Sequence, residues 1–301
     1  MGMLRRVLAV VAALAVVAGC SSIRLAYNYA DDYVYHTLDQ AFGLDDTQQT
    51  RVSASLRDVH AWHRSTQLDL YRESLVLARD RLAGDPTPAD VEEFLARVRS
   101  HTRVLTEQAA RPLAQLLISL RPEQLTRIEE QFARDADRFV REARKETHED
   151  RLKRRVGRVE ESYRFWLGRL SEAQLARVRT LWQDRTNHHE TAYAERQARQ
   201  AVMLTLVRDL ATTQPPIEEA EQRVKATAIL LEASQDPTRR AYFEKLGEDS
   251  ARMISDVLVL RSEAQRRALD RRLAGLAEDL VALANRGRPG QAVAAEAEPK
   301  R

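Results

Sequence analysis

The stretch Leu170-Ser171-Glu172-Ala173-Gln174-Leu175 has the pattern of a helix start, and similar stretches recur along the chain. Ser171 and Gln174 have the spacing of a capping box, in which each polar side chain satisfies a free N–H at the helix start. Leu170 and Leu175 occupy the positions of a hydrophobic staple. Related starts occur at Leu44 with Gln48, at Leu120 with Gln124, and at Ser262 with Gln265. The recurrence predicts that several helices begin in the same way.

The composition favours helices throughout. The 301 residues include only 10 Gly and 9 Pro, and most of these fall where other signals also predict a helix end. Ala, Leu, Arg, Glu and Gln predominate between them, and no alternating strand pattern occurs outside residues 1–19. We therefore predict an all-α fold, an elongated multi-helix bundle of long antiparallel helices. The expected helices span residues 25–40, 46–83, 87–119, 122–168, 171–211, two stretches between 217 and 261, and 262–285.

The expected helix 122–168 has an unusual middle, because residues 144–151 are almost wholly polar. Apolar residues resume after this stretch with the spacing of a buried helix face. The polar stretch is explained either by a solvated segment that projects beyond its neighbours or by a surface for a partner.

The two halves of the chain resemble each other. The loop Gly84-Asp85-Pro86 lies about as far after Gln48 as the loop Thr212-Thr213-Gln214 lies after Gln174. This pattern favours a tandem duplication, with residues 44–169 as the first helical repeat and 170–286 as the second. Coincidence is the alternative, because short loops between helices are common.

Residues 1–19 have the pattern of a targeting segment. Arg5 and Arg6 form a basic region, and the apolar run Val7 to Val17 is too short to span a membrane. The run ends in Val17-Ala18-Gly19-Cys20, which resembles the lipobox of bacterial lipoproteins. The resemblance implies a signal peptide over residues 1–19 and lipidation of Cys20, the only cysteine. An ordinary cleaved signal or an uncleaved anchor is the alternative.

The lipobox resemblance also implies a location. Ser21 and Ser22 follow Cys20, without the aspartate that resembles an inner-membrane retention signal, so we expect an outer-membrane, lipid-anchored protein that faces the periplasm. Residues 20–43 would form the lipidated N-terminus and a short Tyr-rich helix. Its tyrosines either contact the membrane interface or pack against the next helix. Residues 287–301 lack apolar periodicity, so we expect a disordered tail.

The charge of the chain gives no reason to expect nucleic-acid binding. The chain contains 48 Lys and Arg against 45 Asp and Glu. Loss of residues 1–19 would remove Arg5 and Arg6 and leave 46 basic residues, so the remaining chain is close to neutral. Binding to nucleic acid depends on a positive surface that neutralises phosphates.

One pair of histidines is a candidate for metal binding or pH sensing. Counted from the glutamine of each repeat, His63 corresponds to His189, and both continue apolar helix faces. If the repeats packed symmetrically, these histidines could form a shared metal or pH-sensing site. The neighbouring candidates are His60, Trp62, Asp184 and His188. The alternative is a pair of hydrogen-bonded core histidines.

Motifs typical of other catalytic or binding sites are absent from the sequence. The sequence contains no HExxH metal motif, no glycine-rich phosphate loop and no GxSxG nucleophile motif. We therefore predict no catalytic residue and no cofactor, and no metal site is firmly predicted.

Two family resemblances bear on function. Cys20, the Leu44 to Gln48 stretch, Trp62-His63-Arg64 and Tyr71 resemble an uncharacterised family of proteobacterial outer-membrane lipoproteins. The helix starts also resemble the LTxxQ motif of Spy/CpxP-like periplasmic chaperones, with Asp45, Arg121 and Ser171 in place of the threonine. We expect a non-catalytic binding or scaffold protein of the cell envelope with unfolded or envelope proteins as partners, and a chaperone-like role is its specific version. The alternative is a metal-dependent or hydrolytic enzyme with its site at the His63/His189 face.

Overall fold

The fold of residues 20–286, which are the residues that the structure describes, is entirely helical. In the computed structural model these residues form twelve helices and no strand, which confirms the predicted all-α class. The predicted leader and tail lie outside the described residues. The helices are α2 (Cys20–Asn28), α3 (Ala30–Phe42), α4 (Asp46–Thr66), α5 (Leu68–Leu82), α6 (Pro88–Ile118), α7 (Pro122–Lys145), α8 (His148–Leu167), α9 (Glu172–Asn187), α10 (His189–Thr213), α11 (Ile217–Leu230), α12 (Pro237–Val259) and α13 (Glu263–Asn285).

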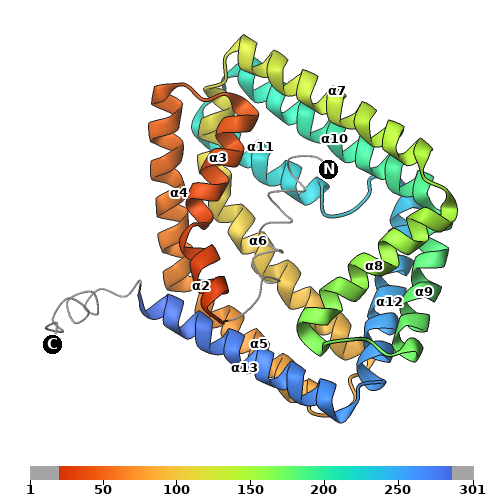
Figure 1. Ribbon diagram of the computed structural model, residues 1–301. Helices are drawn as coiled ribbons and strands as arrows, with labels where there is room; N and C mark the ends of the chain where they lie inside the picture. Colours follow the sequence, from red (N-terminus) through yellow and green to blue (C-terminus); the bar gives the residue numbers. More distant parts are fainter. Residues whose placement is uncertain (1–19, 287–301) are drawn as a thin grey trace, which may run out of the picture.

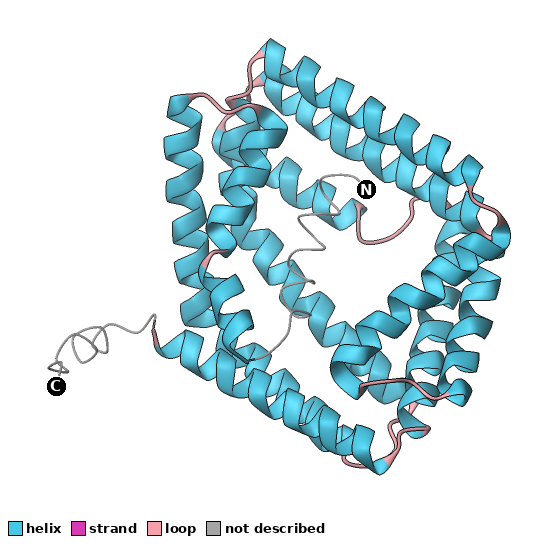
Figure 2. Ribbon diagram, in the orientation of Figure 1, coloured by secondary structure: helices cyan, strands magenta, loops and turns pink. Residues whose placement is uncertain are grey.

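The helices pack as the sides of a four-sided frame rather than as one elongated bundle (Figure 1). Helices α7 and α10 form one side, and α5 and α13 form the side opposite. Helices α3 and α4 form a third side, and α8, α9 and α12 form the fourth. Helix α6 packs against α11 and α12. Short loops connect most of the helices (Figure 2).

The frame arises because the longest expected helices are broken. The expected helices 46–83, 122–168 and 171–211 each turn in the middle, after Thr66, Lys145 and Asn187 respectively. The break after Lys145 corrects the interpretation of residues 144–151 as the middle of one helix. Thr147 accepts a hydrogen bond from the Asp150 N–H and forms a capping box with Asp150, so the polar stretch contains a new helix start. The expected first helix is also divided, at Tyr29.

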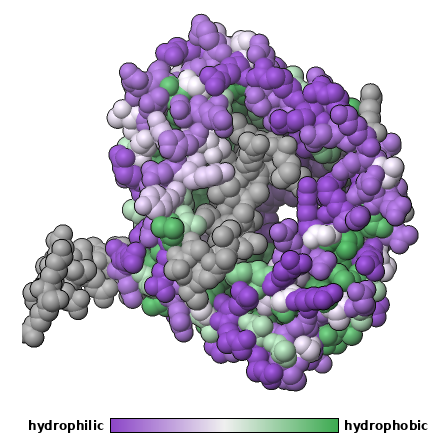
Figure 3. All heavy atoms as spheres, in the orientation of Figure 1, coloured by the Kyte–Doolittle hydropathy of each residue, from purple (hydrophilic) through white to green (hydrophobic). Residues whose placement is uncertain are grey.

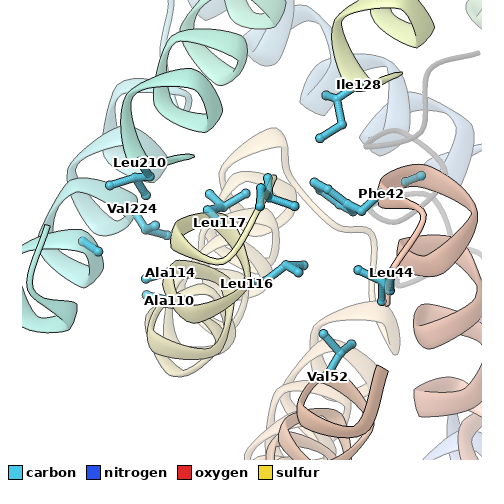
Figure 4. Close-up of a cluster of buried hydrophobic side chains, with 13 residues drawn as sticks. Phe42, Leu44, Val52, Ala110, Ala114, Leu116, Leu117, Ile128, Leu210 and Val224 are labelled. Carbon is cyan, nitrogen blue, oxygen red and sulfur yellow. The ribbon is translucent and has the colours of Figure 1, made fainter. Parts of the chain in front are cut away.

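The largest hydrophobic cluster lies where α3, α4, α6, α7, α10 and α11 meet. Phe42 at the end of α3, Leu117 of α6, Ile128 of α7 and Leu210 of α10 point toward one another (Figure 4). Leu117, Ile128 and Leu210 are each at most 1% exposed. The cluster therefore joins helices from both predicted repeats.

Two further clusters hold the remaining sides together. One contains buried residues of α8, α9, α12 and α13, among them Val178 and Val257. The other is small and joins Leu68 at the start of α5 to Leu280, Leu283 and Ala284 at the end of α13. These contacts close the frame between an early helix and the last one.

The outer surface is mostly hydrophilic on the face shown in Figure 3, with hydrophobic residues gathered mainly in its lower part. None of the helices between residues 20 and 286 combines the length and the apolarity that a membrane span requires.

Candidate functional site

The helix-start glutamines pair with each other at opposite corners of the frame. Nε2 of Gln48 donates to Oε1 of Gln124 at 3.1 Å, and Nε2 of Gln124 donates back to Oε1 of Gln48 at 2.7 Å. Gln174 and Gln265 form the same reciprocal pair, at 3.2 and 3.1 Å. We call these two arrangements the glutamine pairs. The starts of α4 and α7 meet at one corner, and the starts of α9 and α13 meet at another (Figure 1).

Each paired glutamine also satisfies backbone groups. In the second pair, Oε1 of Gln174 accepts from the Ser171 N–H at 2.9 Å, and its Nε2 donates to the Val257 carbonyl at 3.0 Å. Gln265 likewise accepts from the Ser262 N–H and donates to the Arg169 carbonyl. The glutamines of the helix-start motif are therefore buried structural residues, and capping alone did not predict that they would meet.

The leucines of the motif are buried as the staple predicts. Leu44, Leu120 and Leu170 are between 2% and 6% exposed. At the fourth start the equivalent position is Arg261, which is also buried. Its guanidinium donates to the Gly84 carbonyl at 3.0 Å, in the loop after α5. Burial lowers the pKa of Arg261.

His63 lies between two tyrosine hydroxyls. Its Nδ1 is 2.8 Å from Oη of Tyr27 on α2, and its Nε2 is 3.0 Å from Oη of Tyr71 on α5. A neutral imidazole has one donor and one acceptor nitrogen, so one of these hydroxyls donates to the ring and the other accepts from it. Both ring nitrogens of His63 are therefore occupied by groups of the chain itself.

Burial sets the ionisation of this cluster. Burial, with a smaller contribution from the nearby His60, lowers the pKa of His63 to about 4. Burial also raises the pKa values of Tyr27 and Tyr71. His63 is therefore neutral at pH 7. A general base works best with a pKa near the operating pH, so His63 is poorly suited to proton transfer there.

The surrounding polar groups attach the first two helices to α4. His60 lies 3.4 Å from the Asp31 carboxylate of α3, and Arg64 donates to Oδ1 of Asn28 at 2.9 Å. The Arg64 guanidinium also lies over the ring of Tyr27, 5.2 Å from its centre. The interpretation of His63 as a hydrogen-bonded buried histidine fits this geometry. Tyr27 belongs to the Tyr-rich helix for which packing against the next helix was one expectation, but its pairing with His63 was not predicted.

The structure does not bring His63 and His189 together. His189 is exposed at the start of α10. The α4–α5 and α9–α10 junctions lie at different corners of the frame (Figure 1). Asp184 and His188 are also exposed, and the ring of His188 lies 5.0 Å from that of Tyr242. The described residues contain no group of three or more His, Cys, Asp or Glu side chains that could hold a metal ion. The expected shared site is thus not formed, because the frame separates the two junctions.

Trp62 lies in a different environment, a cleft between α4, α6 and α11. The cleft has a volume of about 540 Å³. Trp62 and Asp58 line it from α4, Gln108 and Pro112 line it from α6, and Lys225 lines it from α11. Because Pro112 has no backbone N–H, the Gln108 carbonyl loses its usual helical donor. The sequence marked Trp62 as a candidate but did not predict the helices that face it.

The charges of this cleft are unevenly paired. Arg111 forms ion pairs with Glu218 and Glu221, and Lys225 also pairs with Glu221 at 2.6 Å. Both basic groups of the lining are thus engaged. Asp58 and Glu107 also line the cleft, and no carboxylate oxygen of either lies within 4 Å of a basic group of the described residues. The cleft therefore offers hydrogen-bond acceptors and a tryptophan ring to a ligand that brings donors.

Comparison with protein families gives one match. Residues 40–224 match a family described as a family of unknown function, DUF6279. This range covers more than half of the 301 residues, and it confirms the expectation of an uncharacterised family. No curated protein and no solved structure matches the chain.

Proposed function

We propose that this chain, which belongs to the DUF6279 family of unknown function, is a lipid-anchored scaffold that faces the periplasm and binds other envelope proteins through the Trp62 cleft. The observation that carries the proposal is the cleft itself, in which a partly exposed tryptophan lies beside two carboxylates that form no ion pair with any described residue. Tryptophan is enriched among the residues that dominate binding energy at protein interfaces.

The chemistry of the cleft favours a partner segment that carries lysine or arginine. A cation over the Trp62 ring would gain a cation–π contact, and Asp58, Glu107 and the Gln108 carbonyl would accept its N–H groups. An extended segment is favoured because a cleft between helices admits a narrow chain more easily than a folded domain. Unfolded envelope proteins would present such segments, which is the chaperone-like version of the proposal.

The proposed lipid anchor fits the docking of helix α2. Cys20, the lipobox cysteine, lies in α2, which packs against α13 and is joined to α4 by the Tyr27–His63 hydrogen bond. Arg24 pairs with the fully buried Asp279 at 2.5 Å. A lipid on Cys20 would therefore be joined to the frame by a docked helix rather than by a long linker. The cleft would then stay close to the membrane surface.

The alternative of an enzyme at the His63/His189 face has little support. The two histidines lie at different corners, and His63 is held neutral by burial between tyrosines. We place the binding activity at the Trp62 cleft instead.

Site-specific crosslinking in intact cells tests the proposal. A photoreactive residue placed at Val104, which lines the cleft and is 38% exposed, should form covalent adducts with a partner protein. Val98 is the matched control, because it lies on the same helix α6, is 43% exposed and is outside the cleft lining. The Trp62→Ala change should remove the Val104 adducts. Equal adducts at both valines, or adducts only with lipid or with the chain itself, would contradict the proposed binding site.

The chaperone-like version needs its own measurement. Residues 21–301, which lack Cys20, should slow the aggregation of an unfolded client protein at equal molar ratio, and Trp62→Ala should abolish the effect. The chaperone-like role is wrong if the unmodified chain does not slow aggregation. The scaffold role still stands in that case if a photoreactive residue at position 104 crosslinks to a folded partner.

A further inference from the structure

Three large side chains along α2, α3 and the turn between them are exposed. Leu25 is 60% exposed, Tyr29 is 59% exposed and Tyr33 is 46% exposed. The Tyr29 N–H donates to the Leu25 carbonyl at 3.3 Å, and the Tyr33 N–H donates to the Tyr29 carbonyl at 3.0 Å. Helical bonding therefore continues through the turn at Tyr29, and the spacing of four residues places the three side chains on one side. We call Leu25, Tyr29 and Tyr33 the N-terminal stripe.

The same two helices partly bury their other two tyrosines. Tyr27 packs against His60 and His63, and Tyr35 packs against the largest hydrophobic cluster. The tyrosines thus divide into an inward set that attaches the helices and an outward set that the frame leaves uncovered. The two interpretations of the Tyr-rich helix, packing and membrane contact, therefore concern different residues.

The position of the stripe relative to Cys20 indicates which surface the stripe contacts. Leu25 follows Cys20 by only five residues and Tyr33 by thirteen. At 1.5 Å per residue the stripe extends to roughly 20 Å from the cysteine, even if the two helices were collinear. We infer that the N-terminal stripe lies in the interfacial region of the membrane that holds the proposed lipid anchor. This inference rests on the lipid anchoring in the proposed function.

The chemistry of the stripe fits a membrane interface better than a protein partner. Tyrosine has an apolar ring and a polar hydroxyl, and it is enriched at the level of lipid headgroups. Leu25 would reach deeper among the acyl chains. Stable protein interfaces use about 20 to 30 residues on each side, far more than this stripe provides. A lipid anchor removes the need for a large interface, because it already holds the surface at high local concentration.

The consequence is a fixed orientation of the frame. A lipid alone would allow the protein to tumble above the membrane, whereas contact along α2 and α3 would hold these helices against the surface. The other sides of the frame, including α7 and α10, would then project toward the periplasm.

Fluorescence of the full-length protein in vesicles tests this inference. The protein is purified from membranes and reconstituted in phosphatidylcholine vesicles with or without brominated acyl chains, which quench nearby tryptophan. The Tyr29→Trp variant adds one emitter to the three native tryptophans, and Ile229→Trp is the matched control. Ile229 is 67% exposed on α11, outside the stripe. We expect brominated vesicles to remove most of the added emission of Tyr29→Trp and little of that of Ile229→Trp.

Two results would distinguish a failure of the membrane contact from a failure of the lipid anchor. If the protein is acylated at Cys20 by intact mass and bound to vesicles, but Tyr29→Trp is quenched no more than Ile229→Trp, the membrane contact is wrong and the anchor stands. If the intact mass shows no acylation, the proposed anchor is wrong. Equal and strong quenching at both positions would contradict the fixed orientation.

Discussion

Burial of His63 between two tyrosines makes the stability of the chain depend on pH. The pKa of His63 is lowered to about 4, whereas an unfolded histidine titrates near 6.5. Between these values the unfolded chain binds a proton that the folded chain does not. The free energy of unfolding therefore falls as the pH falls from 6.5 to 4, by at most about 3 kcal/mol from this residue.

The His63→Gln variant tests this dependence. It should lose less stability than the unmodified chain between pH 7 and pH 4.5 in urea unfolding, because glutamine does not titrate. The control is His36→Gln, since His36 is exposed on α3. An unchanged pH dependence in His63→Gln would show that other groups cause the acid sensitivity.

The glutamine pairs predict a second effect of a single residue. Gln174 is fully buried, so Gln174→Ala would leave the Ser171 N–H, the Val257 carbonyl and the amide of Gln265 without their partner. We expect a loss of about 3 kcal/mol in the free energy of unfolding. The control is Asp90→Ala, which removes the same position of an exposed capping box and should cost about 1 kcal/mol.

A double-mutant cycle separates pairing from capping. If Gln174 and Gln265 stabilise each other, the Gln174→Ala and Gln265→Ala changes together should cost clearly less than the sum of the two single changes. Additive losses would mean that each glutamine acts only as a cap of its own helix.

At the scale of residues, the sequence predicted which side chains have a structural role better than it predicted which side chains they contact. Capping boxes at Ser171 and Ser262 follow from local spacing and are present. The meeting of Gln174 with Gln265 depends on how helices 91 residues apart pack, which no local pattern encodes. His63 was recognised as a notable residue for the same local reason, but its partner was assigned by an assumed symmetry of the repeats.

At the scale of helices, the attachment of α2 to α13 involves one buried charge. The Asp279 side chain is fully buried, and Arg24 is its ion-pair partner. The Arg24→Gln change would leave this carboxylate without its counter-charge, at a cost of about 3 kcal/mol. Hydrogen exchange should show faster exchange of the α2 amides than of the α4 amides.

The rescue variant sharpens this prediction. Adding Asp279→Asn to Arg24→Gln removes the buried charge, so the double variant should be more stable than Arg24→Gln alone. If both variants are equally destabilised, the effect of Arg24 comes from packing rather than from its charge.

The extents of the helices show what local signals can miss. The chain turns after Thr66 and Asn187 without Gly or Pro at the break, so composition predicted one long helix in each place. Tertiary contacts compensate for the break after Thr66, where the Leu68 side chain is buried against α13. The turn at Thr147 is different, because its capping box with Asp150 is visible in the sequence.

At the scale of the molecule, the two glutamine pairs are what a tandem duplication would produce. One pair joins two starts in the region 44–169, and the other joins two starts in the region 170–286. The duplication stays a prediction. The proposed repeats are nevertheless not independent in packing, because α5 lies against α13, and α6 lies against α11 and α12.

The closed frame predicts that the family-matched region cannot fold alone. The match ends at residue 224, within α11. A fragment of residues 40–224 would retain Gln174 but lose Gln265, and it would retain Leu68 but lose Leu283, on which it packs. It would also lose α12, the partner of α6 and α9. We expect this fragment to be helical by circular dichroism yet to melt without a cooperative transition, whereas residues 20–286 should melt in one transition. A cooperative melt of the fragment, at a temperature close to that of residues 20–286, would show that the matched region is a separate folding unit to which the last helices are added.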